Sequence, residues 1–343
     1  MFSQATKDKL SQSGWTSWLP QTIYTQLFLL TTLLESTIDI GIEAALLDTF
    51  EGLHGLVSGS DPVSERSALP VYLSIFVLAH IFQVALSIDA IQNKNTIQII
   101  GLCLFNALFL LYAIIQIQEI RQAFTSINKQ LNVLINVIPI VISVTEIIFL
   151  SLSWKLYREF GWQVYKQIGA DRRVKKMFLH YQVFICILKF DYFFFVCFSL
   201  QFVLLVLNQG DIERWLTLAA APLTLAVLVS AYYAVRNEVR WLMTAFIGWC
   251  VVGGAYFTFK LYRIYQGKAG AYHLVFKSLT VFSAFSLVLL CATFAVAIIC
   301  LGNFDRGLKQ HMTSRKPVAD KTELDGRFNH LGSSISIGRM SID

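Results

Sequence analysis

Charged residues are scarce in this chain of 343 residues. Only 15% of the residues are Asp, Glu, Lys or Arg, and 55% are hydrophobic. A typical soluble domain carries about 25% charged residues. This composition excludes a soluble enzyme with a membrane tail, a disordered chain and a secreted domain held together by disulfides.

The motifs of common enzyme classes are also missing. The sequence has no H-E-x-x-H, no P-loop and no G-x-S-x-G, and its six histidines are scattered. We therefore expect no enzyme, no cofactor and no metal site, although a lipid-modifying membrane enzyme is a third, weaker hypothesis. The six cysteines lie within or at the end of apolar runs and form no C-x-x-C, which indicates small core residues.

Instead, the chain has long apolar runs of about twenty residues, which is the length that crosses a hydrocarbon core. They predict an all-α, polytopic transmembrane helical bundle. A seven-span alternative places the first segment on the membrane surface. The predicted spans are 22–48, 70–91, 96–117, 133–153, 182–207, 216–235, 241–264 and 275–301, which divide the chain into a cytosolic segment 1–20, a bundle 21–302 and a cytosolic tail 303–343.

The charges of two connecting segments predict the orientation. Segment 154–181 has seven basic and two acidic residues, a net charge of +5, whereas 49–69 has one basic and three acidic residues. Basic loops stay on the cytosolic side, so eight spans place both termini in the cytosol. Lys260, Arg263 and Lys268 disagree, because this topology places them on the lumenal side.

Aromatic and basic residues alternate in the predicted loop 154–181, which suggests a short interfacial helix on the cytosolic leaflet. We expect the bilayer and its anionic lipids as partners, and no nucleic acid; protein partners are left open. The candidate headgroup contacts are Arg172, Arg173, Lys175 and Lys176.

Intramembrane acids are the candidate functional residues. Glu35, Asp39 and Glu43 stand four residues apart in the first span, so they share one helix face. A carboxylate inside the bilayer is costly and usually faces protein or water, which suggests a cation or proton path. The alternative is a partly interfacial helix with its acids near headgroups.

Three further charged residues complete the candidate intramembrane polar site: Glu146, Lys189 and Asp191. Residues two apart do not face each other on a helix, so Lys189 and Asp191 are not an internal pair. Lys189 is expected to snorkel, and Asp191 to need a partner on another helix. Structural pairing between helices is the competing interpretation for all of them. His80 shares a face with Gln83, and we interpret it as a packing residue.

The C-terminal tail mixes Gly, Ser and Pro with both charge signs, which predicts disorder from about residue 312 onward. Its serines are candidate phosphorylation sites, and an inert tail is the alternative. The candidate serines are Ser333, Ser334, Ser336 and Ser341.

Two stretches of the sequence are distinctive: GWQVYKQIGAD (161–171) and LKFDYFFF (188–195). With them the chain resembles an uncharacterised fungal family of multi-pass Golgi apparatus membrane proteins, over roughly residues 15 to 310. The resemblance implies Golgi membrane residence and implies no catalytic residues.

Two functions follow as hypotheses. The first is a non-enzymatic Golgi membrane protein that acts in trafficking, as a scaffold or as a receptor-like bundle. The second is a small-solute or ion/proton-coupled transporter that uses the intramembrane carboxylates. A polar cavity lined by these acids would favour transport, and acids capped by other side chains in a dry bundle would favour structure.

Overall fold

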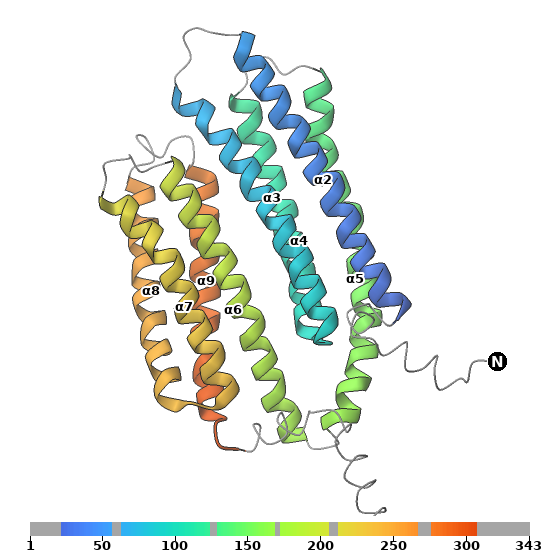
Figure 1. The fold of residues 1–343 in the computed structure, drawn as a ribbon, viewed down its shortest axis with the longest axis vertical. Coiled ribbons are helices and arrows are strands. Elements are labelled where there is room, and N and C mark those ends of the chain that lie inside the picture. Colours follow the sequence, from blue (N-terminus) through green and yellow to red (C-terminus); the bar gives the residue numbers. More distant parts are fainter. Residues whose placement is uncertain are drawn as a thin grey trace, which may run out of the picture.

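The computed structural model describes residues 22–56, 63–123, 129–168, 172–205, 212–266 and 276–306. The N-terminal segment 1–20 and the predicted disordered tail, with its four candidate serines, lie outside the described residues. Every regular element within the described ranges is an α-helix (Figure 1). The helices are α2 (Ile23–Leu56), α3 (Val63–Gln92), α4 (Thr96–Ala123), α5 (Lys129–Ile168), α6 (Arg172–Leu205), α7 (Ile212–Asn237), α8 (Arg240–Gln266) and α9 (Phe276–Gly302).

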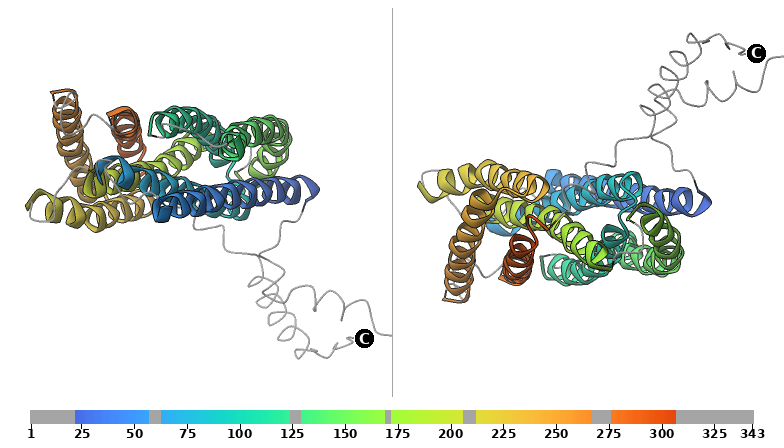
Figure 2. Two further views of the ribbon diagram at one scale, coloured as in Figure 1. Left: turned by 90° about the horizontal axis from the view of Figure 1, so that it is seen from above. Right: turned by 90° about the horizontal axis from the view of Figure 1, so that it is seen from below.

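The helices form two groups of four, seen side by side in Figure 1 and along the helices in Figure 2. In the first group, α2 and α4 each pack against α3 and α5; in the second, α6 and α8 each pack against α7 and α9. The groups meet where α6 contacts α3 and α4. At this seam, Phe82 stacks on Phe193 with ring centroids 4.5 Å apart, and Phe105 lies 5.7 Å from Phe190.

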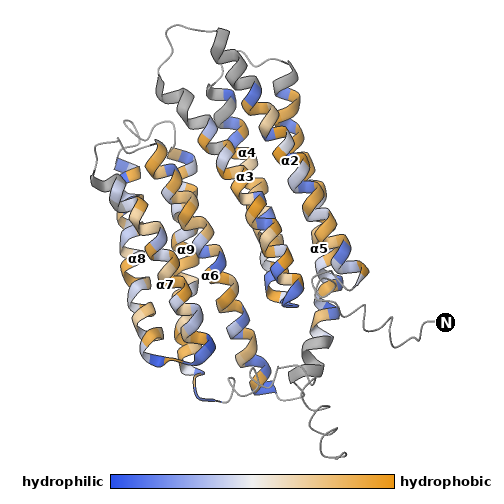
Figure 3. Cartoon of the chain, viewed as in Figure 1, coloured by the Kyte–Doolittle hydropathy of each residue, from blue (hydrophilic) through white to orange (hydrophobic). Residues whose placement is uncertain are grey.

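Hydrophobic residues recur along every helix, as the orange segments in Figure 3 show, and many of the large ones are exposed on the outside of the bundle. Among the described residues, seven helices, α3 to α9, are long and apolar enough to cross a membrane. Leu104, Ile140 and Ile147 are 63%, 61% and 67% exposed, which suits contact with lipid and not with water. Backbone polar groups must be satisfied internally in hydrocarbon, which explains why these runs are helical. The predicted all-α transmembrane bundle is confirmed.

Helix α2 is not among these seven helices, but it packs lengthwise inside the first group. Near its start, the Lys155 ammonium lies 5.4 Å from the centroid of the Tyr24 ring, and Phe28 lies 5.0 Å from Phe149. Further along, Thr145 of α5 donates a hydrogen bond to Glu35. These contacts make α2 antiparallel to α5 over several turns. The structure therefore favours eight bundled helices over a first segment that lies on the membrane surface.

The prediction that 154–181 is a loop containing a separate short interfacial helix is wrong. Helix α5 continues to Ile168 and α6 begins at Arg172, ten residues before the predicted span 182–207. With 40 residues and a rise of about 1.5 Å per residue, α5 is about 60 Å long and extends beyond a hydrocarbon core of about 30 Å. The basic and aromatic residues there belong to the projecting ends of two long helices. Four exposed basic residues lie in the first turns of α6: Arg172, Arg173, Lys175 and Lys176.

The turn between α7 and α8 is a tight hairpin. Only Glu238 and Val239 separate the helices, and Glu238 has a positive φ of 57°. The Glu238 carboxylate accepts a hydrogen bond from the Asp305 amide, and Arg240 forms an ion pair with Asp305 at 2.7 Å. The hairpin thus holds the end of α9.

Gly101 allows α4 to approach α6 closely. A Cβ atom at this position would lie 2.9 Å from Cε2 of Phe190 and 3.1 Å from Sγ of Cys186. We expect Gly101→Leu to lower the free energy of unfolding by about 1–3 kcal/mol, the usual cost of overpacking. The measurement is thermal unfolding of the purified protein in detergent. Gly248→Leu is the matched control, because nothing lies within 4 Å of a Cβ there; equal losses would contradict the close approach.

Candidate functional site

The acids of α2 form a buried stripe. Glu35, Asp39 and Glu43 are 0%, 0% and 1% exposed, and Thr25 and Thr32 continue the same buried face. The shared face predicted from their spacing is present. The acids point into the first group of helices, so the headgroup alternative does not describe them. We call Glu35, Asp39 and Glu43 the acidic stripe.

Glu35 is the centre of a hydrogen-bond network that joins four helices. The Gln83 side-chain amide donates to Glu35 Oε2 at 3.1 Å, and the Thr145 hydroxyl donates to Oε1 at 2.8 Å. Gln83 also donates to Asn106 at 3.2 Å, and Asn106 donates to Glu146 at 3.1 Å. Two carboxylates on α2 and α5 are therefore connected through amides of α3 and α4.

Asp39 lies one turn further along α2 and faces His80 of α3. Nε2 of His80 is 3.4 Å from Oδ2 of Asp39, and both side chains are fully buried. His80 packs between the rings of Phe76 and Phe109, with centroids 5.3 and 4.8 Å away. Their contact has no well-oriented hydrogen bond, and the second oxygen of Asp39 and the second nitrogen of His80 have no partner. This acid and histidine are thus in contact in a fully buried site, with polar atoms left over.

Glu43 ends the stripe. Its Oε1 accepts a hydrogen bond from the Gln116 side-chain amide of α4 at 3.3 Å, and its Oε2 is buried without a partner. Most buried polar atoms in folded proteins are hydrogen-bonded, so a run of unpartnered oxygen atoms on one helix face needs an explanation.

A proton is the ligand that best matches this chemistry. An ionised carboxylate without donors is very costly in an apolar interior, and a bound proton removes that charge. Within the described ranges, no three His, Cys, Asp or Glu side chains are placed to hold a metal ion. The stripe, with His80 beside it, can therefore hold protons, and the amides around Glu35 fix the positions of the carboxyl groups.

Lys189 and Asp191 do not join the acidic stripe. Lys189 is paired at the seam between the two groups, where its ammonium contacts Asp89 of α3 and donates to Gln98 of α4 at 3.0 Å. Asp191 accepts a hydrogen bond from the Thr293 hydroxyl of α9, so its partner comes from another helix. Of the six predicted polar residues, four gather in the first group, one lies at the seam and one lies in the second group.

Several residues of the site were not singled out by the sequence. Gln116, Thr145 and Asp89 each pair with a predicted charged residue. Each of them is a polar residue in a predicted span or at its end. Many such residues make only local contacts, so the sequence alone did not distinguish these three. His80 and Gln83 carried a better signal, because they share a face of one helix.

Long helices with apolar outer surfaces and buried polar contacts define a polytopic helical membrane protein. The chain is similar to a UPF0658 Golgi apparatus membrane protein of Schizosaccharomyces pombe, with 28% identity over 277 residues, which cover 71% of this chain and 78% of the relative. This similarity confirms the resemblance to a fungal Golgi membrane family. No protein-family model matches the chain. No solved structure matches it.

Proposed function

We propose that the protein is a non-enzymatic, multi-pass protein of the Golgi membrane that works as a proton-coupled transporter of small solutes. The observation that carries the proposal is the acidic stripe, in which the fully buried Asp39 contacts His80 at 3.4 Å without a well-oriented hydrogen bond, and one oxygen atom of Glu43 has no partner. Residence in the Golgi is supported by the name of the fission yeast relative.

A purely structural role for the acids is the alternative, and one part of the site fits it. Glu35 and Glu146 are capped by amides and a hydroxyl, as expected of side chains that join helices. Asp39, His80 and Glu43 fit it less well, because Asp39 and His80 contact each other without a well-oriented hydrogen bond and one oxygen atom of Glu43 has no partner, and each unsatisfied buried group weakens a network kept only for stability. The stripe is fully buried in this structure, so transport would require a second conformation that opens it.

Electrical recording from vesicles on a solid support separates the two roles. A sudden change of pH should displace charge in vesicles that contain the purified protein, because protons bind inside the membrane. Protein-free vesicles give the baseline. Solutes added together with the pH change should turn the transient signal into a sustained current when a transported one is present. A protein whose acids only hold helices together would give the baseline signal throughout.

Both termini are expected on the cytosolic side. The eight helices of the described residues, when all of them cross the membrane, return the chain to the side on which it started; the end of α5, the start of α6 and the end of α9 lie at one end of the bundle in Figure 1. Lys260, which disagreed with this orientation, is only 3% exposed, and its ammonium lies 3.7 Å from the centroid of the Phe202 ring. It is therefore inside the bundle and does not count as a loop charge. Protease treatment of sealed vesicles should digest tags at both ends; a shielded N-terminal tag beside a digested C-terminal one would contradict this topology.

A further inference from the structure

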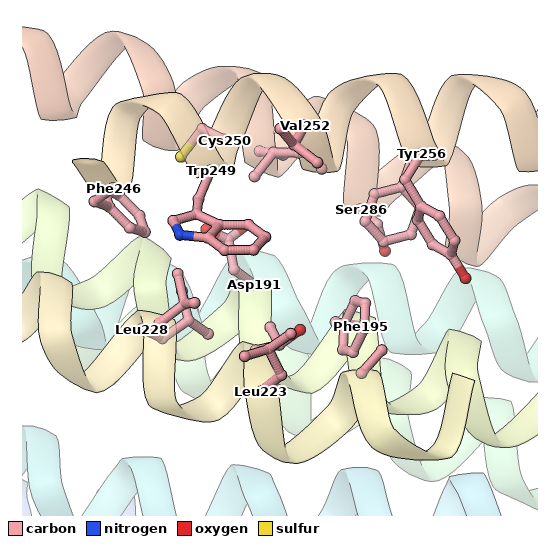
Figure 4. Close-up of a pocket in the computed structure, with 16 residues that line it drawn as sticks. Asp191, Phe195, Leu223, Leu228, Phe246, Trp249, Cys250, Val252, Tyr256 and Ser286 are labelled. Carbon is pink, nitrogen blue, oxygen red and sulfur yellow. The ribbon is translucent and has the colours of Figure 1, made fainter. Parts of the chain in front are cut away.

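A second feature lies in the other group of helices. A cavity of about 240 Å³ opens between α7 and α8, with α6 and α9 behind it. Figure 4 shows Asp191 inside this cavity, near Trp249 and Cys250 of α8 and across from Leu223 and Leu228 of α7. It shares no residue with the acidic stripe.

The polar groups of this cavity are few. Asp191 is held by its hydrogen bond from Thr293, which fixes the carboxyl group against α9. Ser286, also on α9, is 4% exposed, and its hydroxyl oxygen has no hydrogen-bond partner. Most other lining side chains are aliphatic or aromatic. A mainly apolar pocket with a few placed polar groups is the usual form of a small-molecule site.

The mouth of the cavity faces lipid. Leu223, Trp249 and Val252 line it and are 52%, 49% and 59% exposed. They lie within the spans Thr217–Asn237 and Arg240–Gln266. A ligand would therefore enter from the hydrocarbon of the bilayer.

We propose that this cavity binds a lipophilic amine with a single hydrocarbon chain, with its nitrogen at Asp191. A carboxyl group in an apolar site favours a hydrogen-bond donor that carries positive charge and repels carboxylates and phosphates. The volume lies just below the usual range of about 300–1,000 Å³ for ligand pockets, which suits one chain and not a two-chain phospholipid. This inference is independent of the proposed proton coupling.

Photo-crosslinking of the full chain in vesicles tests the proposal. The probe is a long-chain primary alkylamine that carries a diazirine in the chain and a terminal alkyne for detection. The matched probe is the carboxylic acid of the same chain. We expect the amine to label peptides from 220–228 and 246–257, and an unlabelled alkylamine to compete. Asp191→Asn should reduce this labelling about ten-fold or more, because a hydrogen bond to a charged group is usually worth at least that factor in affinity.

Two results would overturn the proposal: equal labelling by the acid probe, and amine labelling that Asp191→Asn leaves unchanged. Asp48→Asn, an exposed acid on α2, is the control and should label as the wild type does. If Asp191→Asn fails to fold, Thr224→Phe replaces it, because this change fills the cavity from α7 and leaves Asp191 in place. Labelling of Thr224→Phe at the wild-type level would equally contradict a site in this cavity.

Discussion

Replacing Asp39 by Asn should reduce the charge displaced by a pH change to the level of protein-free vesicles. Asn has nearly the same shape as Asp, but it does not take up or release a proton at the pH values of the experiment. Asp48→Asn is the matched control, because Asp48 lies on the same helix and is exposed. It should leave the signal unchanged. A wild-type signal from Asp39→Asn would show that Asp39 is not the proton site.

Stability separates a functional acid from a structural one. Asp39 Oδ2 lies 3.4 Å from His80 Nε2 without a well-oriented hydrogen bond, so the nearly isosteric Asn loses little and removes an acid whose charged form is costly to bury. We therefore expect the thermal midpoint of Asp39→Asn in detergent to equal or exceed that of the wild type. Functional sites often carry such a cost in stability. A marked fall in the midpoint together with the lost signal would assign Asp39 to the structure of the bundle.

Gln83→Leu is expected to have the largest effect on stability. Gln83 donates to both Glu35 and Asn106, so its loss leaves two buried oxygen atoms without a donor. We expect the free energy of unfolding to fall by roughly 2–5 kcal/mol, since each unsatisfied buried group costs about 1–3 kcal/mol and a charged one more. Thermal unfolding in detergent measures this loss. Gln92→Leu, at the exposed end of α3, is the control.

A double variant tests whether these residues act as one network. Asn106→Leu removes the acceptor of Gln83 and the donor to Glu146. In one network, the loss in the double variant should be clearly smaller than the sum of the two single losses. Additive losses would mean that Gln83 and Asn106 act separately, and Glu35 and Glu146 would then not be connected.

The sequence predicted the helices well because the length of an apolar run is set by the bilayer. It also placed Glu35, Asp39 and Glu43 on one face, because that depends only on the helical period. It did not predict the ends of α5 and α6. The residues from 154 to 168 are polar and aromatic, which suggested a loop, but a helix that leaves the hydrocarbon core needs no apolar sequence to continue.

Pairing between helices was beyond the sequence. That Asp191 needed a partner followed from its burial in a span, but only the packing of α6 on α9 shows that the partner is Thr293. Lys189 was expected to reach toward the membrane surface, yet α3 places Asp89 within bonding distance. A side chain takes the nearest compatible partner, and the neighbours of a helix are a tertiary property that one sequence does not reveal.

Infrared difference spectroscopy of the carboxyl groups measures directly whether the acidic stripe binds protons reversibly inside the bundle. The purified protein in lipid is cycled between higher and lower pH. We expect the carbonyl band of a protonated, buried carboxyl group at lower pH in the wild type and in Asp48→Asn, and the loss of part of that band in Asp39→Asn. Identical difference spectra for the wild type, Asp39→Asn, Glu35→Gln and Glu43→Gln would contradict reversible proton binding by the acidic stripe.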